Sequence, residues 1–220
     1  MSKKYKLTDE TVKINGKTLH RIEALKDFNN VKRGDKGGFV ESELNLSQKG
    51  NCWIYNNAYV YDDACVNDNA RIANNAIIND NAHIYDNAEI LDYAYVFCNA
   101  HIYDNARVSG NARVFENAKV CGNTVVFGET CMRGTAIVLD NTDYIVFKNW
   151  WSSGRYFTWT RSNNMWSVGC FYGTGEELIK KAYQDSKKSG LEYERIVHYV
   201  EDVLKSENNG KEIQVNRRNH

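Results

Sequence analysis

An apolar residue recurs at every sixth position through the middle of the chain, from residue 54 to residue 138. Fourteen of these fifteen positions hold Ile or Val, the β-branched residues that a buried pleated surface prefers. A period of six does not match the 3.6-residue period of an α-helix, so the pattern predicts short strands. The fifteen positions are Ile54, Val60, Val66, Ile72, Ile78, Ile84, Ile90, Val96, Ile102, Val108, Val114, Val120, Val126, Met132 and Val138.

A small residue, Ala or Thr, follows each of these positions by four, and Asn directly precedes it in eleven of the fifteen units. Asn, Asp and Gly adopt positive φ more readily than other residues, so each unit is expected to be a short strand followed by a tight corner. Three sides of six residues make one coil of 18. The fifteen units therefore predict a parallel β-helix of about five coils, in which each inward Ile or Val stacks on the one 18 residues away.

The chain before the repeats differs from them in pattern. Asn15-Gly16 lies between two short segments of strand character, Thr11–Ile14 and Thr18–Ile22, which is the signal of a β-hairpin. Residues 1–47 are therefore predicted to form an N-terminal β cap, and residues 48–143 the rod.

After residue 143 the composition changes abruptly, with ten aromatic residues between Tyr144 and Tyr172. Residues 144–206 are predicted to form three strands of an antiparallel sheet and then two helices, which open at Thr174 and Ser189. Residues 207–220 are polar and are predicted to be disordered. The predicted fold class is all-β with a small α+β C-terminal domain.

The composition then restricts the classes of partner. Lys and Arg together number 28, as do Asp and Glu, so no overall charge attracts nucleic acid or an anionic membrane. No run of 18 apolar residues could span a membrane, and the basic N-terminus is not followed by the apolar segment of a signal peptide. The six cysteines show no CxxC and no paired spacing, which is typical of a reduced protein. We therefore expect a cytoplasmic protein without a membrane partner.

The segment that leads into the repeats resembles a known family. Its motifs are Leu25-Lys26-Asp27-Phe28-Asn29-Asn30-Val31-Lys32, Gly37-Gly38-Phe39-Val40, Leu46-Ser47-Gln48 and Gly50-Asn51-Cys52-Trp53-Ile54-Tyr55. They are similar to the entry segment of the YdcK-like branch of the hexapeptide-repeat family, which occurs in bacteria and bacteriophages.

This resemblance covers about residues 1–143, and we recognise no family in residues 144–206. It implies a single-stranded, left-handed β-helix, whereas six-residue periodicity alone also suits the right-handed helices of bactofilin filaments. The best-known hexapeptide-repeat proteins are trimeric acyltransferases, and the YdcK-like branch is usually labelled as acetyltransferase. Domains at both ends of the rod would disfavour bactofilin-like polymerisation.

Stacking at 18 residues sorts the outward side chains into three faces. One face is nearly continuous in aromatic and apolar residues, and such surfaces usually mark interfaces. We expect it to bind a protein partner or to form a homo-oligomer, a dimer or a trimer, although outward aromatics can also simply stabilise neighbouring strands. The residues of this predicted interface are Tyr59, Tyr61, Ile77, Tyr95, Phe97, Arg113 and Phe115.

His83 and His101 lie 18 residues apart in near-identical units and are therefore expected to stack one coil apart, with Cys65 one coil before them. They are candidate catalytic residues, because the resemblance implies a His that takes a proton from an acceptor while acyl-CoA lies along the rod. A polar surface ladder is the alternative. One straight column cannot complete a tetrahedral metal shell without another subunit, so we predict no metal site. The acyltransferases normally carry a loop that interrupts the repeats, and none interrupts these fifteen units.

The aromatic segment after the rod offers a third possibility. It contains Lys148, Arg155 and Arg161 but no Asp or Glu between residues 144 and 172, and aromatic rings beside Arg suit stacking on bases. The alternative is that these rings form the core of a small sheet. The candidate ligand-binding or nucleotide-binding residues are Trp150, Trp151, Arg155, Tyr156, Trp159, Arg161 and Trp166.

These patterns favour a non-catalytic binding protein that presents a rigid β-helix surface and needs no cofactor. By analogy with phage proteins, such a chain would inhibit a host factor, for example a CRISPR or other defence component. One alternative is an O- or N-acetyltransferase of the hexapeptide-repeat family that uses acetyl-CoA. Another is a nucleotide or nucleic-acid binder that acts through the aromatic C-terminal domain.

Overall fold

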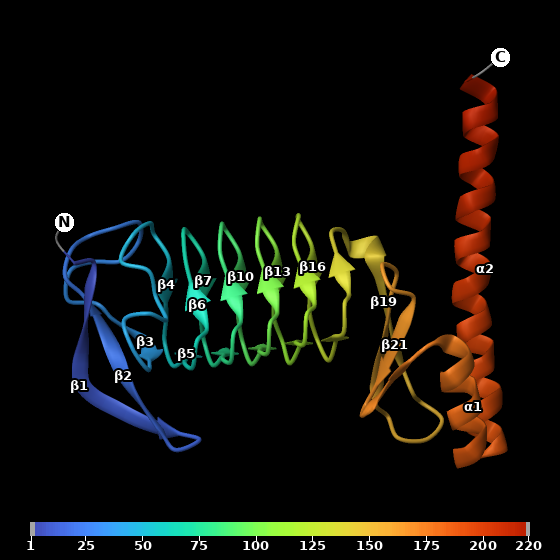
Figure 1. The fold of residues 1–220 in the computed structure, drawn as a ribbon, viewed down its shortest axis with the longest axis horizontal. Coiled ribbons are helices and arrows are strands. Elements are labelled where there is room, and N and C mark those ends of the chain that lie inside the picture. Colours follow the sequence, from blue (N-terminus) through green and yellow to red (C-terminus); the bar gives the residue numbers. More distant parts are fainter. Residues whose placement is uncertain (1–2, 219–220) are drawn as a thin grey trace.

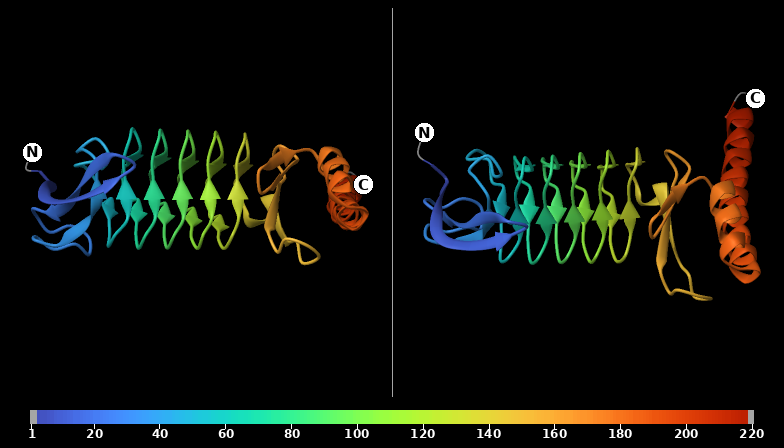
Figure 2. Two further views of the ribbon diagram at one scale, coloured as in Figure 1. Left: turned by 90° about the horizontal axis from the view of Figure 1, so that it is seen from below. Right: turned by 60° about the horizontal axis from the view of Figure 1, so that its bottom comes forward.

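The computed structural model describes residues 3–218 and arranges three parts along one long axis (Figure 1). A β-hairpin with the segment after it forms one end, a regular rod forms the middle, and a small sheet with two helices forms the other end. Two further views show the coils stacked regularly between the end parts (Figure 2). None of the helices in residues 3–218 is long and apolar enough to cross a membrane.

The rod consists of fifteen two-residue strands, each of which pairs in parallel with the strand one coil away. Their inward Ile, Val and Met side chains are fully buried in one continuous core. The structure thus confirms the parallel β-helix of about five coils, and it is left-handed. The strands are β4 (Trp53–Ile54), β5 (Tyr59–Val60), β6 (Cys65–Val66), β7 (Arg71–Ile72), β8 (Ile77–Ile78), β9 (His83–Ile84), β10 (Glu89–Ile90), β11 (Tyr95–Val96), β12 (His101–Ile102), β13 (Arg107–Val108), β14 (Arg113–Val114), β15 (Lys119–Val120), β16 (Val125–Val126), β17 (Cys131–Met132) and β18 (Ile137–Val138).

Each corner of the rod between residues 56 and 134 has one residue with positive φ, two positions before the small residue. Asp, Asn or Gly holds most of these corners, and Cys98 and Glu116 are the exceptions. An Asp at this position also accepts a hydrogen bond from the next coil, as the Asp80 carboxylate does from the Cys98 amide at 2.9 Å. The following Asn side chains form amide ladders, for example from Asn69 to Asn87 at 3.1 Å. The corners therefore link neighbouring coils as well as turning the chain.

The N-terminal part contains β1 (Tyr5–Ile14), β2 (Lys17–Ala24) and β3 (Lys36–Val40). The first two form an antiparallel hairpin, and the turn residues Asn15 and Gly16 have φ of 50° and 80°, as the type I′ signal predicts. The structure differs at the boundary of the cap, because β3 pairs in parallel with β5 and Leu46 bridges to Val66. The chain from β3 to Leu46 therefore forms an incomplete first coil of the rod.

Two adjacent glycines allow this first coil to approach the rod closely. A Cβ atom on Gly38 would lie 2.5 Å from the carbonyl oxygen of Ala58, and one on Gly37 would lie 2.6 Å from that of Ile54. No side chain fits at such distances, so any substitution here would push the first coil away from the second.

Both ends of the rod are closed by side chains. At the N-terminal end, the buried Lys4 ammonium donates to the carbonyl oxygens of Lys49 at 3.1 Å and Cys52 at 2.9 Å. At the C-terminal end, side-chain oxygens accept hydrogen bonds from amides of the last coil that have no further strand to pair with. These bonds run from Val125 to Asn141 (2.7 Å), Cys131 to Thr158 (3.1 Å), Ile137 to Ser162 (2.7 Å) and Leu139 to Asp143 (2.9 Å).

After a short 3-10 turn, η1 (Asn141–Asp143), four strands form an antiparallel sheet in sequence order. Two helices follow and pack on this sheet around buried aromatic rings. The first helix begins with the predicted capping box, in which Thr174 and Glu177 exchange hydrogen bonds. The elements are β19 (Tyr144–Lys148), β20 (Tyr156–Thr160), β21 (Met165–Val168), β22 (Phe171–Gly173), α1 (Gly175–Asp185) and α2 (Lys187–Arg218).

This C-terminal part differs from the sequence-based expectation in three respects. The sheet has a fourth strand, β22, whose three residues are too few to show a periodic pattern. The second helix begins at Lys187 rather than at Ser189. It also continues to Arg218 through the segment predicted to be disordered, while residues 219 and 220 lie outside the described chain. Once the packed first turns have nucleated a helix, polar residues extend it at little cost.

Candidate functional site

The two histidines lie on one outward face of the rod, formed by β6, β9, β12, β15 and β18. We call this the histidine face and define it by Cys65, His83, Tyr85, His101, Tyr103 and Lys119. His101 pairs in register with His83 on one side and with Lys119 on the other, and His83 pairs with Cys65. The two imidazole rings are parallel, with centroids 5.0 Å apart and planes 7° apart. The 18-residue spacing thus brings the predicted histidines together.

A thiol holds the first of these rings. The Cys65 Sγ atom lies 2.9 Å from His83 Nδ1. Burial raises the pKa of Cys65, so the thiol keeps its proton at neutral pH and its S–H can donate a hydrogen bond to the imidazole. With Nδ1 as acceptor, the proton of a neutral His83 lies on Nε2. The 18-residue spacing predicted that Cys65 lies beside His83. The short sulfur–nitrogen distance suits the Cys65 thiol to orient the His83 ring.

The second ring is suited to act as a base. Burial, followed by the neighbouring His83 and Lys119, lowers the pKa of His101, so its imidazole is neutral at pH 7 and can accept a proton. The Tyr85 ring meets it edge-on, with centroids 6.3 Å apart, and stacks on Tyr103 at 5.0 Å. A hydrogen bond with Cys121, together with burial, raises the pKa of Tyr103. This face therefore combines a neutral imidazole, a cation and protonated phenols.

A second outward face, formed by β5, β8, β11, β14 and β17, carries the predicted interface residues. We call it the aromatic face and define it by Tyr59, Tyr61, Ile77, Tyr95, Phe97, Arg113 and Phe115. Its central rings stack closely, with centroids 4.3 Å apart for Tyr95 and Phe97 and 4.6 Å apart for Phe97 and Phe115. The Arg113 guanidinium lies over both phenylalanine rings, at 5.7 and 5.5 Å.

The β1–β2 hairpin covers the N-terminal half of the aromatic face. Leu19 and Phe39 bury Tyr61, which is only 3% exposed, and Val12 and Ile14 pack at the same cluster with Tyr59 and Ile77. Tyr61 therefore packs with Leu19 of the hairpin and Phe39 of β3, and Tyr59 and Ile77 pack at the same cluster. The half-buried rings of Tyr95, Phe97 and Phe115 are not part of this cluster. The sequence analysis did not predict that the hairpin packs on this face. Val12, Ile14 and Leu19 were the available signal, because apolar residues of a hairpin need a surface to pack on.

The seven candidate ligand-binding residues of the C-terminal part divide into buried and exposed groups. Trp151, Trp159 and Trp166 are buried in the core between the sheet and the helices, so their rings are not available to a ligand. Arg161 pairs with Glu207 at 2.8 Å. The remaining three are Trp150, which is 74% exposed, Tyr156 and Arg155.

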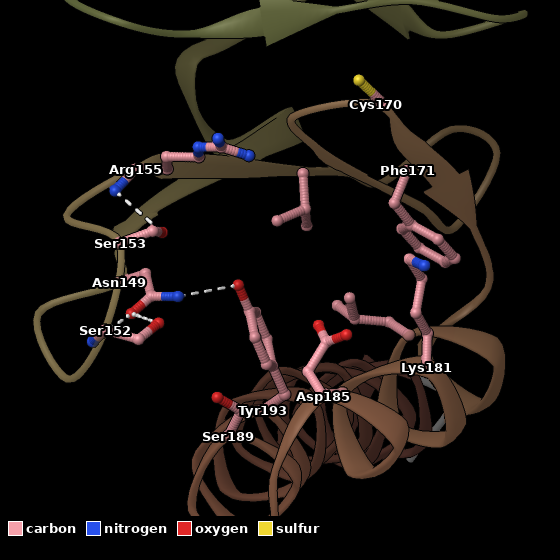
Figure 3. A pocket seen from close by; sticks show the side chains of 13 residues that line it. Asn149, Ser152, Ser153, Arg155, Cys170, Phe171, Lys181, Asp185, Ser189 and Tyr193 are labelled. Atoms are coloured by element: carbon pink, nitrogen blue, oxygen red, sulfur yellow. Dashed lines mark hydrogen bonds between the residues drawn. The ribbon is translucent and has the colours of Figure 1, made fainter.

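Two of the exposed members, Tyr156 and Arg155, line hollows. Tyr156 lies at an apolar groove of about 860 Å³ with Phe127 and Tyr144, where the last coil meets the sheet. Arg155 lies at a polar pocket between the sheet and the helices, together with Lys181, Asp185 and other residues shown in Figure 3. Sequence reasoning did not join Arg155 to residues of the helices, because no repeat or motif relates their positions.

The comparisons with known proteins show a partial likeness. No family model matches the chain. Over 50 residues it is 44% identical to a protein named "Uncharacterized acetyltransferase YdcK" from Escherichia coli strain K12. This stretch covers 22% of the chain and 15% of that protein, so the likeness concerns a small part of both. The likeness agrees with the β-helix, and the matched protein is named as an acetyltransferase. Nothing in the comparisons supports a phage-type inhibitor.

Proposed function

We propose that this protein is an acyl-CoA-dependent acetyltransferase whose reaction takes place on the histidine face. The observation that carries the proposal is the stacked pair of His83 and His101, with a neutral imidazole at His101 beside Lys119. The left-handed β-helix and the partial likeness to a protein named as an acetyltransferase support the same reaction class.

In this reaction His101 acts as the general base. It takes a proton from the acceptor hydroxyl or amine, whose oxygen or nitrogen attacks the thioester carbonyl of acetyl-CoA. The carbon–sulfur bond breaks, and CoA leaves as the thiol after it takes up a proton. A pKa below the ordinary histidine value suits this role, because the imidazole is already unprotonated when the acceptor arrives.

The remaining residues of the histidine face would position the substrates. Cys65 holds His83, and the parallel stacking of His83 on His101 fixes the plane of the second ring. Lys119 is exposed and adjacent, so its ammonium would pair with a phosphate group of CoA. The face is open along the rod, and a second copy of the chain would be needed to exclude water from it.

The test uses acetyl-CoA as the probe. Acetyl-CoA is expected to raise the melting temperature of the protein, because a ligand of the native state stabilises it. With a mixture of small amines and alcohols as acceptors, CoA thiol release is expected to fall about a hundredfold or more in His83→Ala/His101→Ala. The stability of this variant should change by less than about 1 kcal/mol, since both side chains are only partly buried on the outside of the rod and do not belong to its core.

His198→Ala serves as the matched control, because His198 is exposed on α2, away from the rod. It should leave both the melting shift and thiol release unchanged. The proposal fails if acetyl-CoA does not shift the melting temperature, or if thiol release is the same in the wild type and the double variant.

The aromatic face supports a second candidate function, recognition of a protein partner. The stacked Tyr95, Phe97 and Phe115 rings under Arg113 form a half-buried apolar surface with a cation, a composition typical of interface centres. Either a second copy of the chain or a foreign protein would bury it. The hairpin already covers the other half, so the contact would begin where the hairpin ends.

Light scattering distinguishes these partners. If copies of the chain associate here, Tyr95→Glu/Phe97→Glu should convert the wild-type oligomer to a monomer. Tyr93→Glu is the control, since Tyr93 is an exposed aromatic residue at a corner. A monomeric wild type at tens of micromolar would assign the face to a foreign protein, and an oligomer that survives both charges would exclude this face.

A further inference from the structure

The pocket between the C-terminal sheet and the two helices has the features of a small-molecule site. Its walls are the loop from Asn149 to Arg155, the turn after β21, the inner side of α1 and the first turns of α2 (Figure 3). Its volume is about 260 Å³, which corresponds to roughly nine water molecules at about 30 Å³ each. This space suits a small metabolite rather than a nucleotide.

Three charged side chains line this pocket without an ion-pair partner among the described residues. They are the cations Arg155 and Lys181 and the carboxylate of Asp185. Lys181 and Asp185 are four residues apart on α1, where a pair could form, yet no bridge joins them. This order of charges is the less favourable one for a helix pair. Both signs of charge are therefore available to a ligand.

Two buried hydroxyl groups face the same space. Tyr193 is 7% exposed, and its oxygen accepts a hydrogen bond from Asn149 Nδ2 at 3.2 Å. Ser152 donates to Asn149 Oδ1 at 3.0 Å and so fixes this amide, which leaves the phenolic proton of Tyr193 free to donate. Ser189 lines the same pocket and is 8% exposed, so its hydroxyl group is a further possible acceptor for a ligand.

The charges act directly on the Tyr193 hydroxyl. Burial raises the pKa of Tyr193 most. The hydrogen bond from Asn149 and the charge of Arg155 oppose this rise, whereas Asp185 adds to it. The phenol therefore stays protonated and remains a donor at neutral pH. The floor is apolar, since Leu178 and Ala182 are buried and Val168 and Phe171 are partly buried beside them.

We propose that this pocket binds a small zwitterion of the α-amino-acid class with an apolar side chain. Arg155, Lys181 and the Tyr193 hydroxyl hold the carboxylate, Asp185 and Ser189 accept from the ammonium, and the side chain lies on the Leu178 floor. A simple carboxylic acid would leave Asp185 without a partner, and a simple amine would meet two cations. The proposal concerns the C-terminal part alone and does not depend on acetyl transfer at the histidine face.

Isothermal titration of the full chain with leucine, valine and methionine tests this proposal. For each amino acid, the amine and the carboxylic acid of the same carbon skeleton are titrated as matched probes. At least one amino acid is expected to bind, and removing either charged group should weaken binding about tenfold or more. Inorganic phosphate is titrated in parallel.

The variants Arg155→Ala, Lys181→Ala and Asp185→Asn change exposed side chains and should leave the melting temperature unchanged. Each is expected to weaken amino-acid binding about tenfold. Lys180→Ala is the control, because Lys180 is the neighbouring exposed lysine on α1 and does not line the pocket.

Four results would overturn the proposal. They are no binding of any of the three amino acids at about 10 mM, binding of phosphate or of the simple acid alone, binding that survives all three substitutions, and equal loss in Lys180→Ala. None of them bears on acetyl-CoA, so the two proposals can fail separately.

Discussion

At the scale of single residues, the corners of the rod show which side chains fit a left-handed backbone. Asp and Asn tolerate positive φ, and an Asp there also accepts an amide proton from the next coil. Gly relieves the strain but gives no such bond. Cys98, with φ of 55°, neither relieves the backbone strain nor accepts such a hydrogen bond. It occupies the same position as Asp80 in the preceding coil.

Replacing Cys98 with Asn should therefore stabilise the protein. Asn is already present at two other corners with this conformation, Asn56 and Asn74, where φ is 55° and 63°. The expected gain in the free energy of unfolding is about 1 kcal/mol, which is the usual strain of an ordinary residue in the left-handed backbone conformation. Chemical denaturation measures it, with Cys170→Asn as control, since Cys170 is exposed and has no positive φ. Equal stability of the wild type and Cys98→Asn would contradict the strain argument.

His101 should make stability depend on pH. In the unfolded chain a histidine takes up its proton near pH 6.5, whereas burial lowers the pKa of His101 in the folded protein. Below pH 6.5 the unfolded state therefore binds more protons, and stability falls as the pH drops through this window.

The expected result is a smaller loss of melting temperature between pH 7.5 and pH 5.5 in His101→Asn than in the wild type. His198→Asn provides the comparison, because that histidine is exposed on α2. If the wild type and His101→Asn lose the same amount, the imidazole at position 101 does not have the lowered pKa.

At the scale of elements, the repeats hold each other in place. A two-residue strand has no stability alone, and the burial of each inward Ile or Val contributes about 1.5–3 kcal/mol only when the neighbouring coils are formed. Val96 lies fully buried in the middle coil. The coils on both sides therefore depend on it.

Val96→Asp should unfold the rod cooperatively, because an unpaired buried carboxylate costs several kcal/mol. Circular dichroism is expected to show the loss of β-structure in one transition at a much lower temperature. Thr135→Asp places the same charge on an exposed corner and should melt as the wild type does. A normal melting curve for Val96→Asp would be incompatible with the continuous core.

The elements also show what could be predicted from the sequence. The period of six identified the inward Ile, Val and Met residues of all fifteen two-residue strands, and the 18-residue spacing placed His83 beside His101, because each coil repeats the same local geometry. The hairpin over Tyr61 and the length of α2 were not predicted, since they depend on contacts between distant segments. The pocket around Tyr193 likewise joins a loop, a turn and two helices that no pattern connects.

At the scale of the whole molecule, the end parts complete the hydrogen bonding of the rod. An open end of a β-helix would present unpaired amides to any other strand. Here Thr158 and Ser162 of the C-terminal sheet accept from Cys131 and Ile137. The C-terminal part therefore protects the last coil as well as forming its own pocket.

Thr158→Val/Ser162→Ala should weaken this end selectively. Each amide that loses its acceptor costs about 1–3 kcal/mol if it stays buried. Hydrogen exchange is expected to accelerate in residues 125–138 and to remain slow in residues 60–80. Ser206→Ala removes a hydroxyl on exposed α2 and should change neither region. Uniform acceleration along the rod would indicate that the caps stabilise the whole fold instead.

The 18-residue coil also determines where the two ends stand relative to each other. Inserting one whole coil would move the C-terminal sheet about 4.8 Å farther away and leave it facing the same direction. Inserting a single six-residue unit would instead rotate it by about a third of a turn, because each unit forms one of the three sides of a coil. The pocket beside Tyr193 would then lie over a different face of the rod. A partner that contacts both the aromatic face and the C-terminal part would therefore still bind the chain with a whole inserted coil. It would not bind the chain with a single inserted unit.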